Sequence, residues 1–295
     1  MRISIVGFGL IGGSIARALR SLNGPAAWHV TAWSRNPAPV KLGLADGVID
    51  VAATRLEEAV ADADLIVLAA PPLVCVELLD RLGADLSRFL PDDATVTDVA
   101  SAKAGIVARA DRARLHFIGG HPMAGREVSG YAASMADLFI GRPWVTVRGQ
   151  CARLGDGERV GELVSACGAI QIPMGSAAHD RAVAAISHLP LVLSAALVET
   201  IAGRPGEPDR GDWKAAEVLA ATGWAGMTRL AKGEPAMGAG IAATNSAAIA
   251  ERLREFRSVL DEWLAELEAP SGPDALRLQK RFAADRARLE KPASD

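Results

Sequence analysis

Two short segments of the sequence combine residue types that suit redox chemistry on an alcohol. Gly7-Phe8-Gly9-Leu10-Ile11-Gly12 has the G-x-G-x-x-G spacing, and Gly119-Gly120-His121 places an imidazole in a glycine-rich turn after an apolar run. In the first segment the glycines allow a tight turn and the close approach of a pyrophosphate, which the N-terminus of the following helix attracts. In the second, a neutral imidazole can accept a proton from a carbinol while hydride leaves the same carbon. The two segments predict a dinucleotide site beside a proton acceptor.

The residues after the second predicted strand bear on which dinucleotide binds. An acidic residue there would bind the ribose 2′-hydroxyl of NAD, but Ala32-Trp33-Ser34-Arg35-Asn36 contains no carboxylate. Ser34 can donate a hydrogen bond and Arg35 a charge-assisted one, which suits a 2′-phosphate. NADP is therefore favoured, and NAD stays open. Pro71, at the sharp exit of a later strand, is expected to line the same cofactor site.

The elements that must position these residues alternate through the first half of the chain. Apolar runs predict strands at 3–7, 29–33, 65–69, 95–99, 117–119, 144–147 and 169–172, with helices at 11–22 and 158–167. After about residue 175, Ala-rich segments with helical periodicity replace the strands. The predicted fold is α/β: a Rossmann-type doubly wound sheet in residues 1–174, followed by an all-α helical substrate and dimerisation domain in residues 175–295.

Composition excludes several classes of protein. The chain has 295 residues, of which 50% are hydrophobic and 23% charged, so it can bury a sizeable core. With 32 Lys+Arg against 35 Asp+Glu, the net charge of −3 gives no reason to expect nucleic acid or an anionic membrane as partner. Three dispersed cysteines fit neither a disulfide framework nor a metal site. Glycines interrupt the apolar start, which argues against a signal peptide. A cytoplasmic protein without metal is expected.

Five segments in order resemble one family. They are Val6–Ser14, Thr97–Lys103, Gly119–Gly125, Ser187-His188-Leu189-Pro190 and Thr228-Arg229. On these the chain resembles the prephenate/arogenate dehydrogenase family of tyrosine biosynthesis over nearly its whole length. The resemblance implies a small-molecule substrate with a cyclohexadienyl ring, a 4-hydroxyl and a ring carboxylate. Hydride would pass from ring C4 to the nicotinamide, and carbon dioxide would leave as the ring becomes aromatic.

The resemblance also implies roles for single residues. His121 matches the histidine that accepts the 4-hydroxyl proton, and Ser101 the serine that hydrogen-bonds near this histidine and the cofactor, although Ser101 could instead cap a helix. Arg229 matches the arginine that binds the substrate carboxylate. Three more residues are candidate substrate contacts: Ser187, His179 and His188, for the last of which a buried structural role is equally open. Glu127 could pair with Arg126 or Arg229, or face solvent.

Departures from the family pattern bear on the substrate. Leu191 stands where prephenate-preferring relatives often carry a second histidine, and Gly238 where some carry a tryptophan. Gly223-Trp224-Ala225-Gly226 replaces a Gly-Phe-Arg-Asp pattern and so loses an ion pair. With fewer partners for an anionic pyruvyl chain, arogenate is favoured. Prephenate dehydrogenase or dual-specificity cyclohexadienyl dehydrogenase activity with NAD remains the alternative.

Other classes and the assembly complete the predictions. The β-hydroxyacid dehydrogenases use a G-x-x-x-K motif, and no glycine of this chain has a lysine four residues later. A non-catalytic NADP sensor would not need the imidazole of His121. The apolar stretches 182–198 and 236–249 predict a homodimer built on the helical half. Within the second stretch, Asn245 is expected to make a buried hydrogen bond at the interface.

Overall fold

The computed structural model describes residues 1–23, 27–126, 128–204, 206 and 212–290. They pack as two compact units, Met1–Ile249 and Ala250–Asp295. The boundary predicted at residues 174 and 175 rests on sequence texture, and it stays a prediction.

The first unit contains an eight-stranded sheet with the order β3-β2-β1-β4-β5-β6-β7-β8. The strands are β1 (Arg2–Val6), β2 (His29–Trp33), β3 (Val51–Ala52), β4 (Leu65–Leu68), β5 (Thr95–Asp98), β6 (Phe117–Pro122), β7 (Pro143–Arg148) and β8 (Ile170–Pro173). Every neighbouring pair is parallel except β6 with β7. The strand order reverses between β1 and β4, which is the switch point where doubly wound sheets bind dinucleotides.

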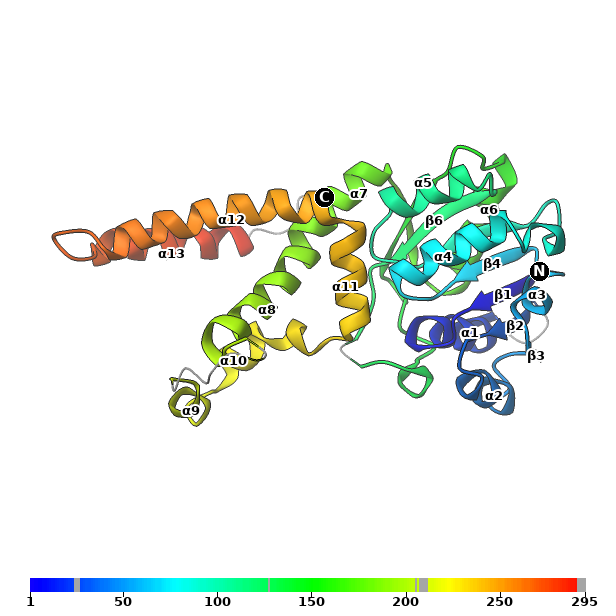
Figure 1. The fold of residues 1–295 in the computed structure, drawn as a ribbon, viewed down its shortest axis with the longest axis horizontal. Coiled ribbons are helices and arrows are strands. Elements are labelled where there is room, and N and C mark those ends of the chain that lie inside the picture. Colours follow the sequence, from blue (N-terminus) through cyan, green and yellow to red (C-terminus); the bar gives the residue numbers. More distant parts are fainter. Residues whose placement is uncertain (24–26, 127, 205, 207–211, 291–295) are drawn as a thin grey trace. The chain divides into compact units, whose positions relative to one another are not determined.

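Helices cover both faces of this sheet (Figure 1). The helices of the sheet half are α1 (Leu10–Asn23), α2 (Ala38–Ala45), α3 (Leu56–Val60), α4 (Pro72–Gly83), α5 (Ala104–Arg112) and α6 (Leu154–Ala166). Alternate side chains of β4 point to opposite faces: Leu65 and Val67 join a core with α1 and α6, whereas Ile66 and Leu68 join one with α3, α4 and α5. The prediction of a doubly wound α/β fold is confirmed.

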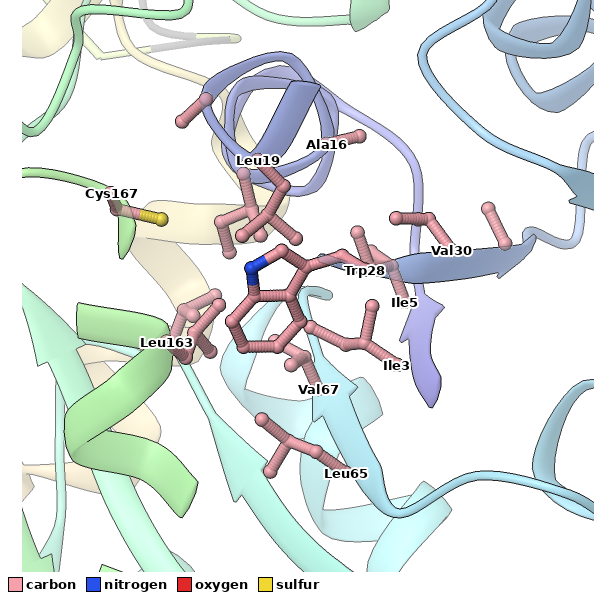
Figure 2. Close-up of a cluster of buried hydrophobic side chains, with 14 of the residues drawn as sticks. Ile3, Ile5, Ala16, Leu19, Trp28, Val30, Leu65, Val67, Leu163 and Cys167 are labelled. Carbon is pink, nitrogen blue, oxygen red and sulfur yellow. The ribbon is translucent and has the colours of Figure 1, made fainter. Parts of the chain in front are cut away.

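Trp28 fills the centre of the first core (Figure 2). Trp28 directly precedes β2 and is 7% exposed. Its side chain lies among Ile3 and Val67 of the sheet, Leu19 of α1 and Leu163 of α6. Burying an aromatic side chain of this size stabilises the fold by about 2 to 3 kcal/mol. This core anchors α1, whose N-terminus carries the glycine turn.

The helical half begins directly after β8. Its helices are α7 (Ser176–Val183), a π-helical turn (Ala184–His188), α8 (Leu189–Ala202), α9 (Asp212–Glu217), α10 (Thr222–Met227), a 3₁₀ turn (Arg229–Lys232), α11 (Pro235–Thr244), α12 (Ser246–Leu267) and α13 (Ala275–Leu289). Within the first unit, α11 packs on α4, where Gly240 lies against Pro72. Within the second unit, Trp263 of α12 contacts Phe282 of α13 at 5.1 Å between ring centroids.

The continuous helical run Ser176–Ala202 is unusually apolar. Among the described helices it alone has the length and composition to cross a membrane, with a hydropathy of 1.7. Only 22% of its apolar window is buried within the chain. An apolar helix that the chain covers so little is typical of an interaction surface.

Candidate active site

The glycine turn after β1 requires glycine on steric grounds. Gly7 has φ = 102°, and a Cβ there would lie 2.4 Å from the carbonyl oxygen of Ala69. A Cβ on Gly12 would lie 2.2 Å from the carbonyl oxygen of Gly7. A Cβ on Gly9, by contrast, would meet no described atom within 4 Å, so the backbone there is open to approach. Two close contacts and one open position fit a pyrophosphate held over the N-terminus of α1.

Phe8 of this turn points away from the open side. Its ring is 2% exposed and stacks on Tyr131, with 5.0 Å between centroids. Only the backbone of Phe8 can therefore face a cofactor. Leu10 and Ile11 open α1, so their backbone N–H groups lie at the positive end of the helix.

The other predicted cofactor residues follow β2 and β4, the strands on either side of β1. Ser34 is half-buried and Arg35 exposed directly after β2, and Pro71 begins the entry into α4 after β4. Among the described residues the Arg35 guanidinium has no ion-pair partner, so a ligand phosphate would not have to displace a carboxylate. The described residues contain no cluster of metal ligands.

His121 lies inside β6 rather than in the turn after a strand ending at residue 119, which corrects the predicted boundary. It pairs with Val145 of β7, and its neighbour Gly120 pairs with Thr146. A Cβ on Gly120 would lie 2.5 Å from the carbonyl oxygen of Asp98, so glycine lets β6 approach β5 closely. The backbone N–H of Gly120 donates to Asp98 Oδ1 at 3.0 Å. The histidine therefore sits on a strand that is fixed from both sides.

A fully buried ion pair underlies this strand. Lys103 Nζ donates to Asp98 Oδ2, and both side chains are 0% exposed. Asp98 also accepts from the N–H of Ala100 at 2.9 Å, and it thereby shapes the turn that carries Ser101. Sequence reasoning gives Asp98 and Lys103 no role. The signal that points to them is an acidic residue ending a buried strand with a lysine five positions later.

Two histidines and a carboxylate form a hydrogen-bonded chain. His121 Nδ1 lies 2.8 Å from His179 Nε2, and His179 Nδ1 lies 2.8 Å from Asp180 Oδ1. Asp180 also accepts from the backbone N–H groups of Lys103 at 2.7 Å and Ala104 at 2.8 Å, which cap the first turn of α5. His179 was expected to contact substrate, but both its ring nitrogens are bonded to protein groups. It is 1% exposed.

His188 belongs to a second buried contact. The π-helical turn 184–188 directs it inward, and it is 0% exposed. Its Nδ1 lies 3.0 Å from Asn245 Nδ2, which also donates to the carbonyl oxygen of Asp180 at 2.9 Å. Of its two readings, the structure supports the buried, hydrogen-bonded one. The buried hydrogen bond predicted for Asn245 is present, and it is made within the chain, so this contact does not need a second copy.

The electrostatics of the cluster favour neutral imidazoles. Burial, reinforced by Lys103 and then by His179 and His188, lowers the pKa of His121 well below its usual value. Burial likewise lowers the pKa of His188 to about 4, against the opposing effect of Asp180. Burial alone would raise the pKa of Asp180, but hydrogen bonds from His179, Ala104 and Lys103 lower it overall. His121 is therefore an unprotonated base that is linked through His179 to an ionised carboxylate.

Three predicted site residues are at least partly accessible to solvent. Ser187 and Arg229 are exposed, and Ser101 is half-buried in the turn between β5 and α5. Ser101 is not the N-cap of α5, because Lys103 occupies that position. Among the described residues no hydrogen bond joins the Ser101 hydroxyl to His121. Glu127, expected near Arg126 or Arg229, lies outside the described residues.

Comparison with known families adds to this geometry. A family model described as "Prephenate dehydrogenase, nucleotide-binding domain" matches residues 15–169. A second, "Prephenate dehydrogenase, dimerization domain", matches residues 175–281. The chain is 30% identical over 269 residues to the prephenate dehydrogenase of Bacillus subtilis, covering 90% of this chain and 68% of that one.

Two solved structures share the fold over almost the full length. Synechocystis arogenate dehydrogenase has a TM-score of 0.77 at 30% identity, covering 98% of this chain and 100% of that chain. Prephenate dehydrogenase from A. aeolicus, in complex with hydroxyphenyl propionate and NAD+, has a TM-score of 0.84 at 25% identity, covering 98% of both chains. Both the arogenate and the prephenate enzyme are thus similar to this chain.

Proposed function

We propose that this chain, which belongs to the prephenate dehydrogenase family, oxidatively decarboxylates arogenate to tyrosine with NADP. The observation that carries the proposal is His121: a buried, neutral imidazole on β6, in the same sheet whose switch point lies between β1 and β4. A base that stays unprotonated at neutral pH suits the removal of a carbinol proton. An NADP sensor would have no use for it.

The chemistry divides between the cofactor and the chain. The nicotinamide, when bound, accepts hydride from ring C4. The glycine turn binds its pyrophosphate, and His121 accepts the 4-hydroxyl proton. Loss of the ring carboxylate as carbon dioxide then makes the ring aromatic, and the phenolate oxygen regains a proton from His121. We assign to Ser101, on the turn between β5 and α5, a contact with cofactor or substrate, and to Arg229 the binding of a carboxylate; the exposure of Arg229 supports this assignment.

The substrate preference rests on the sequence departures. Leu191 and Gly238 offer no charge or ring to an anionic pyruvyl side chain, which favours the zwitterionic side chain of arogenate. The name of the Synechocystis relative agrees with this choice. The alternative is prephenate, or both substrates, with NAD; the A. aeolicus complex with NAD+ favours it.

The cofactor preference rests on Ser34 and Arg35. Exposed Arg35 directly follows β2, where the adenosine ribose lies in Rossmann sites. A guanidinium there favours a 2′-phosphate over a bare hydroxyl.

We further propose that two copies pair through the helical half, in the cytoplasm. The exposed apolar face of Ser176–Ala202 supports pairing, and so does the dimerisation model that matches residues 175–281. A second copy would cover this helix, and an α-helical membrane span is then not needed to explain it. The stretch 236–249 contributes less than expected, because α11 is partly covered by α4 and α5.

The test crosses arogenate and prephenate with NADP and NAD while the absorbance of reduced nicotinamide is followed. The fastest turnover is expected with arogenate and NADP. Arg35→Gln should raise the KM for NADP about tenfold, as expected for the loss of one charge-assisted contact, and leave the KM for NAD unchanged. Arg55→Gln, which removes another exposed arginine, is the matched control. Strong prephenate turnover would overturn the substrate assignment. No turnover with any of the four combinations of substrate and cofactor would favour an NADP sensor.

A further inference from the structure

We infer that His179 and Asp180 are positioning residues that hold His121 in the single tautomer whose Nε2 is a free base. This inference rests on the proposed function of His121 as proton acceptor. It gives His179 a role distinct from the substrate contact expected of it.

The chain of bonds has a defined direction because it starts at a carboxylate. An ionised carboxylate only accepts hydrogen bonds, and Asp180 Oδ1 lies 2.8 Å from His179 Nδ1. His179 must therefore carry its proton on Nδ1. The two backbone donors from Lys103 and Ala104 fix the carboxylate in place, since they occupy both of its oxygens.

The direction passes to the next ring. A His179 ring that carries a single proton, on Nδ1, presents Nε2 as an acceptor. His121 Nδ1, 2.8 Å away, must then be the donor. A neutral His121 with its proton on Nδ1 has an unprotonated Nε2, which is the nitrogen left to face a reacting hydroxyl. The two rings meet edge to face, at 76° between their planes, rather than stacked. This arrangement suits an N–H···N hydrogen bond better than a stack would.

The same chain stabilises the charge that forms during the reaction. When the substrate O–H bond breaks, its proton goes to His121 Nε2, and the C4–H electron pair leaves as hydride to the nicotinamide. The resulting imidazolium is buried and faces Lys103, which opposes a second positive charge, together with His179 and His188. Asp180, one ring away, is the compensating anion. The Asp98 carboxylate is already engaged by Lys103.

The direct test is the tautomeric state of each imidazole, measured by nitrogen NMR on the full-length protein labelled with ¹⁵N-histidine. The chain has only five histidines, so every signal can be assigned by substitution. At pH 7.5, His121 and His179 should both show a protonated Nδ1 and an unprotonated Nε2. Protonated Nε2 on either ring would overturn the inference, whether or not the enzyme turns over.

Two variants test the consequence. Asp180→Asn can present an N–H to His179 Nδ1, which should reverse both tautomers and lower kcat by up to about 10⁴-fold, the loss that the same substitution causes in a catalytic triad. His179→Leu should leave His121 as a mixture of tautomers, with a smaller loss of kcat. The dissociation constant for the cofactor should change less than twofold in both, as it does in the control His116→Gln.

The outcomes separate this inference from the proposed function. If the wild type turns over neither substrate but shows the expected tautomers, the function fails and the positioning stands. If the wild type is active and His179→Leu retains full kcat with an unchanged His121 tautomer, the function stands and the positioning fails. Should Asp180→Asn not fold because α5 loses its cap, the wild-type spectrum and His179→Leu still decide.

Discussion

At the scale of single residues, three buried histidines share one electrostatic environment. His121 and His188 have lowered pKa values because burial disfavours their charged forms. Asp180 is the ionised group among them, and its ionisation is maintained by three hydrogen bonds. His121 and His188 are therefore neutral, and Asp180 is the negative group at the far end, which is the state a proton acceptor needs before the reaction begins.

This state has a consequence for stability at low pH. In the unfolded chain His188 titrates near 6.5, and in the folded chain near 4. As the pH falls between these values, the unfolded chain binds a proton that the folded chain does not, so the free energy of unfolding decreases. Full linkage for this one group corresponds to about 3 kcal/mol at pH 4. His121 acts in the same direction.

Urea denaturation at a series of pH values from 7.5 to 4 checks this dependence. His188→Gln should flatten the slope below pH 6.5, at some cost in stability at pH 7.5. His116→Gln, at a half-buried strand edge, should leave the slope unchanged. A slope that is the same in all three proteins would show that His188 is not protected from protonation.

Sequence reasoning found the histidines but not how they are connected. His121 and His179 stand in recognisable segments, whereas the bond between them joins residues 58 positions apart. For Asn245 the sequence predicts a buried hydrogen bond at an interface, because its neighbours are apolar. Only the fold shows that its amide nitrogen bonds to the carbonyl oxygen of Asp180 and to His188. Which polar groups meet in a core depends on packing, which one sequence does not specify.

At the scale of elements, the segment after the His121 strand is fastened to the glycine turn. Tyr131, the only tyrosine of the chain, stacks on Phe8 and donates its hydroxyl to Asp46 Oδ2 at 2.6 Å. The backbone N–H of Met135 donates to Ser14 Oγ of α1 at 3.0 Å. The loop that follows the His121 strand and the turn predicted to bind cofactor therefore share one anchor.

Substitution of Tyr131 separates the two contacts of this anchor. Tyr131→Phe keeps the stack and loses the hydroxyl bond, so it should cost about 1 kcal/mol of stability and leave cofactor affinity unchanged. Tyr131→Leu also loses the ring against Phe8, and it should weaken NADP binding several-fold as the turn loosens. Urea denaturation and fluorescence titration with NADPH measure the two effects. Equal cofactor affinities in both variants would contradict a coupling through the stack.

Most elements could be predicted, for physical reasons. The sequence predicts seven of the strands within a few residues of their observed bounds. Each is a run of four to six residues, rich in apolar side chains and bounded by turn residues. The two-residue strand β3 was missed because two residues cannot show a periodicity. The antiparallel direction of β7 and the π-helical turn before α8 depend on contacts made elsewhere in the fold, and no local pattern marks them.

At the scale of the whole molecule, the apolar face of Ser176–Ala202 favours an interface with a second copy of the chain. Ile186 on this run is 70% exposed. If two copies pair through it, a charge there would be buried without compensation, at a cost of several kcal/mol. A monomer would instead leave Ile186 and the partly covered apolar side chains of this run in water.

Light scattering at micromolar concentration checks the assembly. The wild type should be a dimer, and Ile186→Glu should shift it towards monomer. Leu154→Glu, on α6 of the nucleotide-binding half and 87% exposed, is the matched control and should remain dimeric. A wild type that is monomeric at this concentration would contradict the pairing.

Asp180 shows how narrowly one position can be constrained. Its two oxygens receive two backbone N–H groups of α5 and the ring of His179 at once. A library of variants selected for heat resistance and another selected for turnover should both retain aspartate here, for different reasons. His121 should differ: the first library should tolerate replacements there more readily, because the His121 ring bonds to the side chain of His179, whereas Asp180 also binds the backbone of α5. Comparing the two libraries would separate positions required for stability from positions required for turnover. Asp180 should be among the few that are required for both.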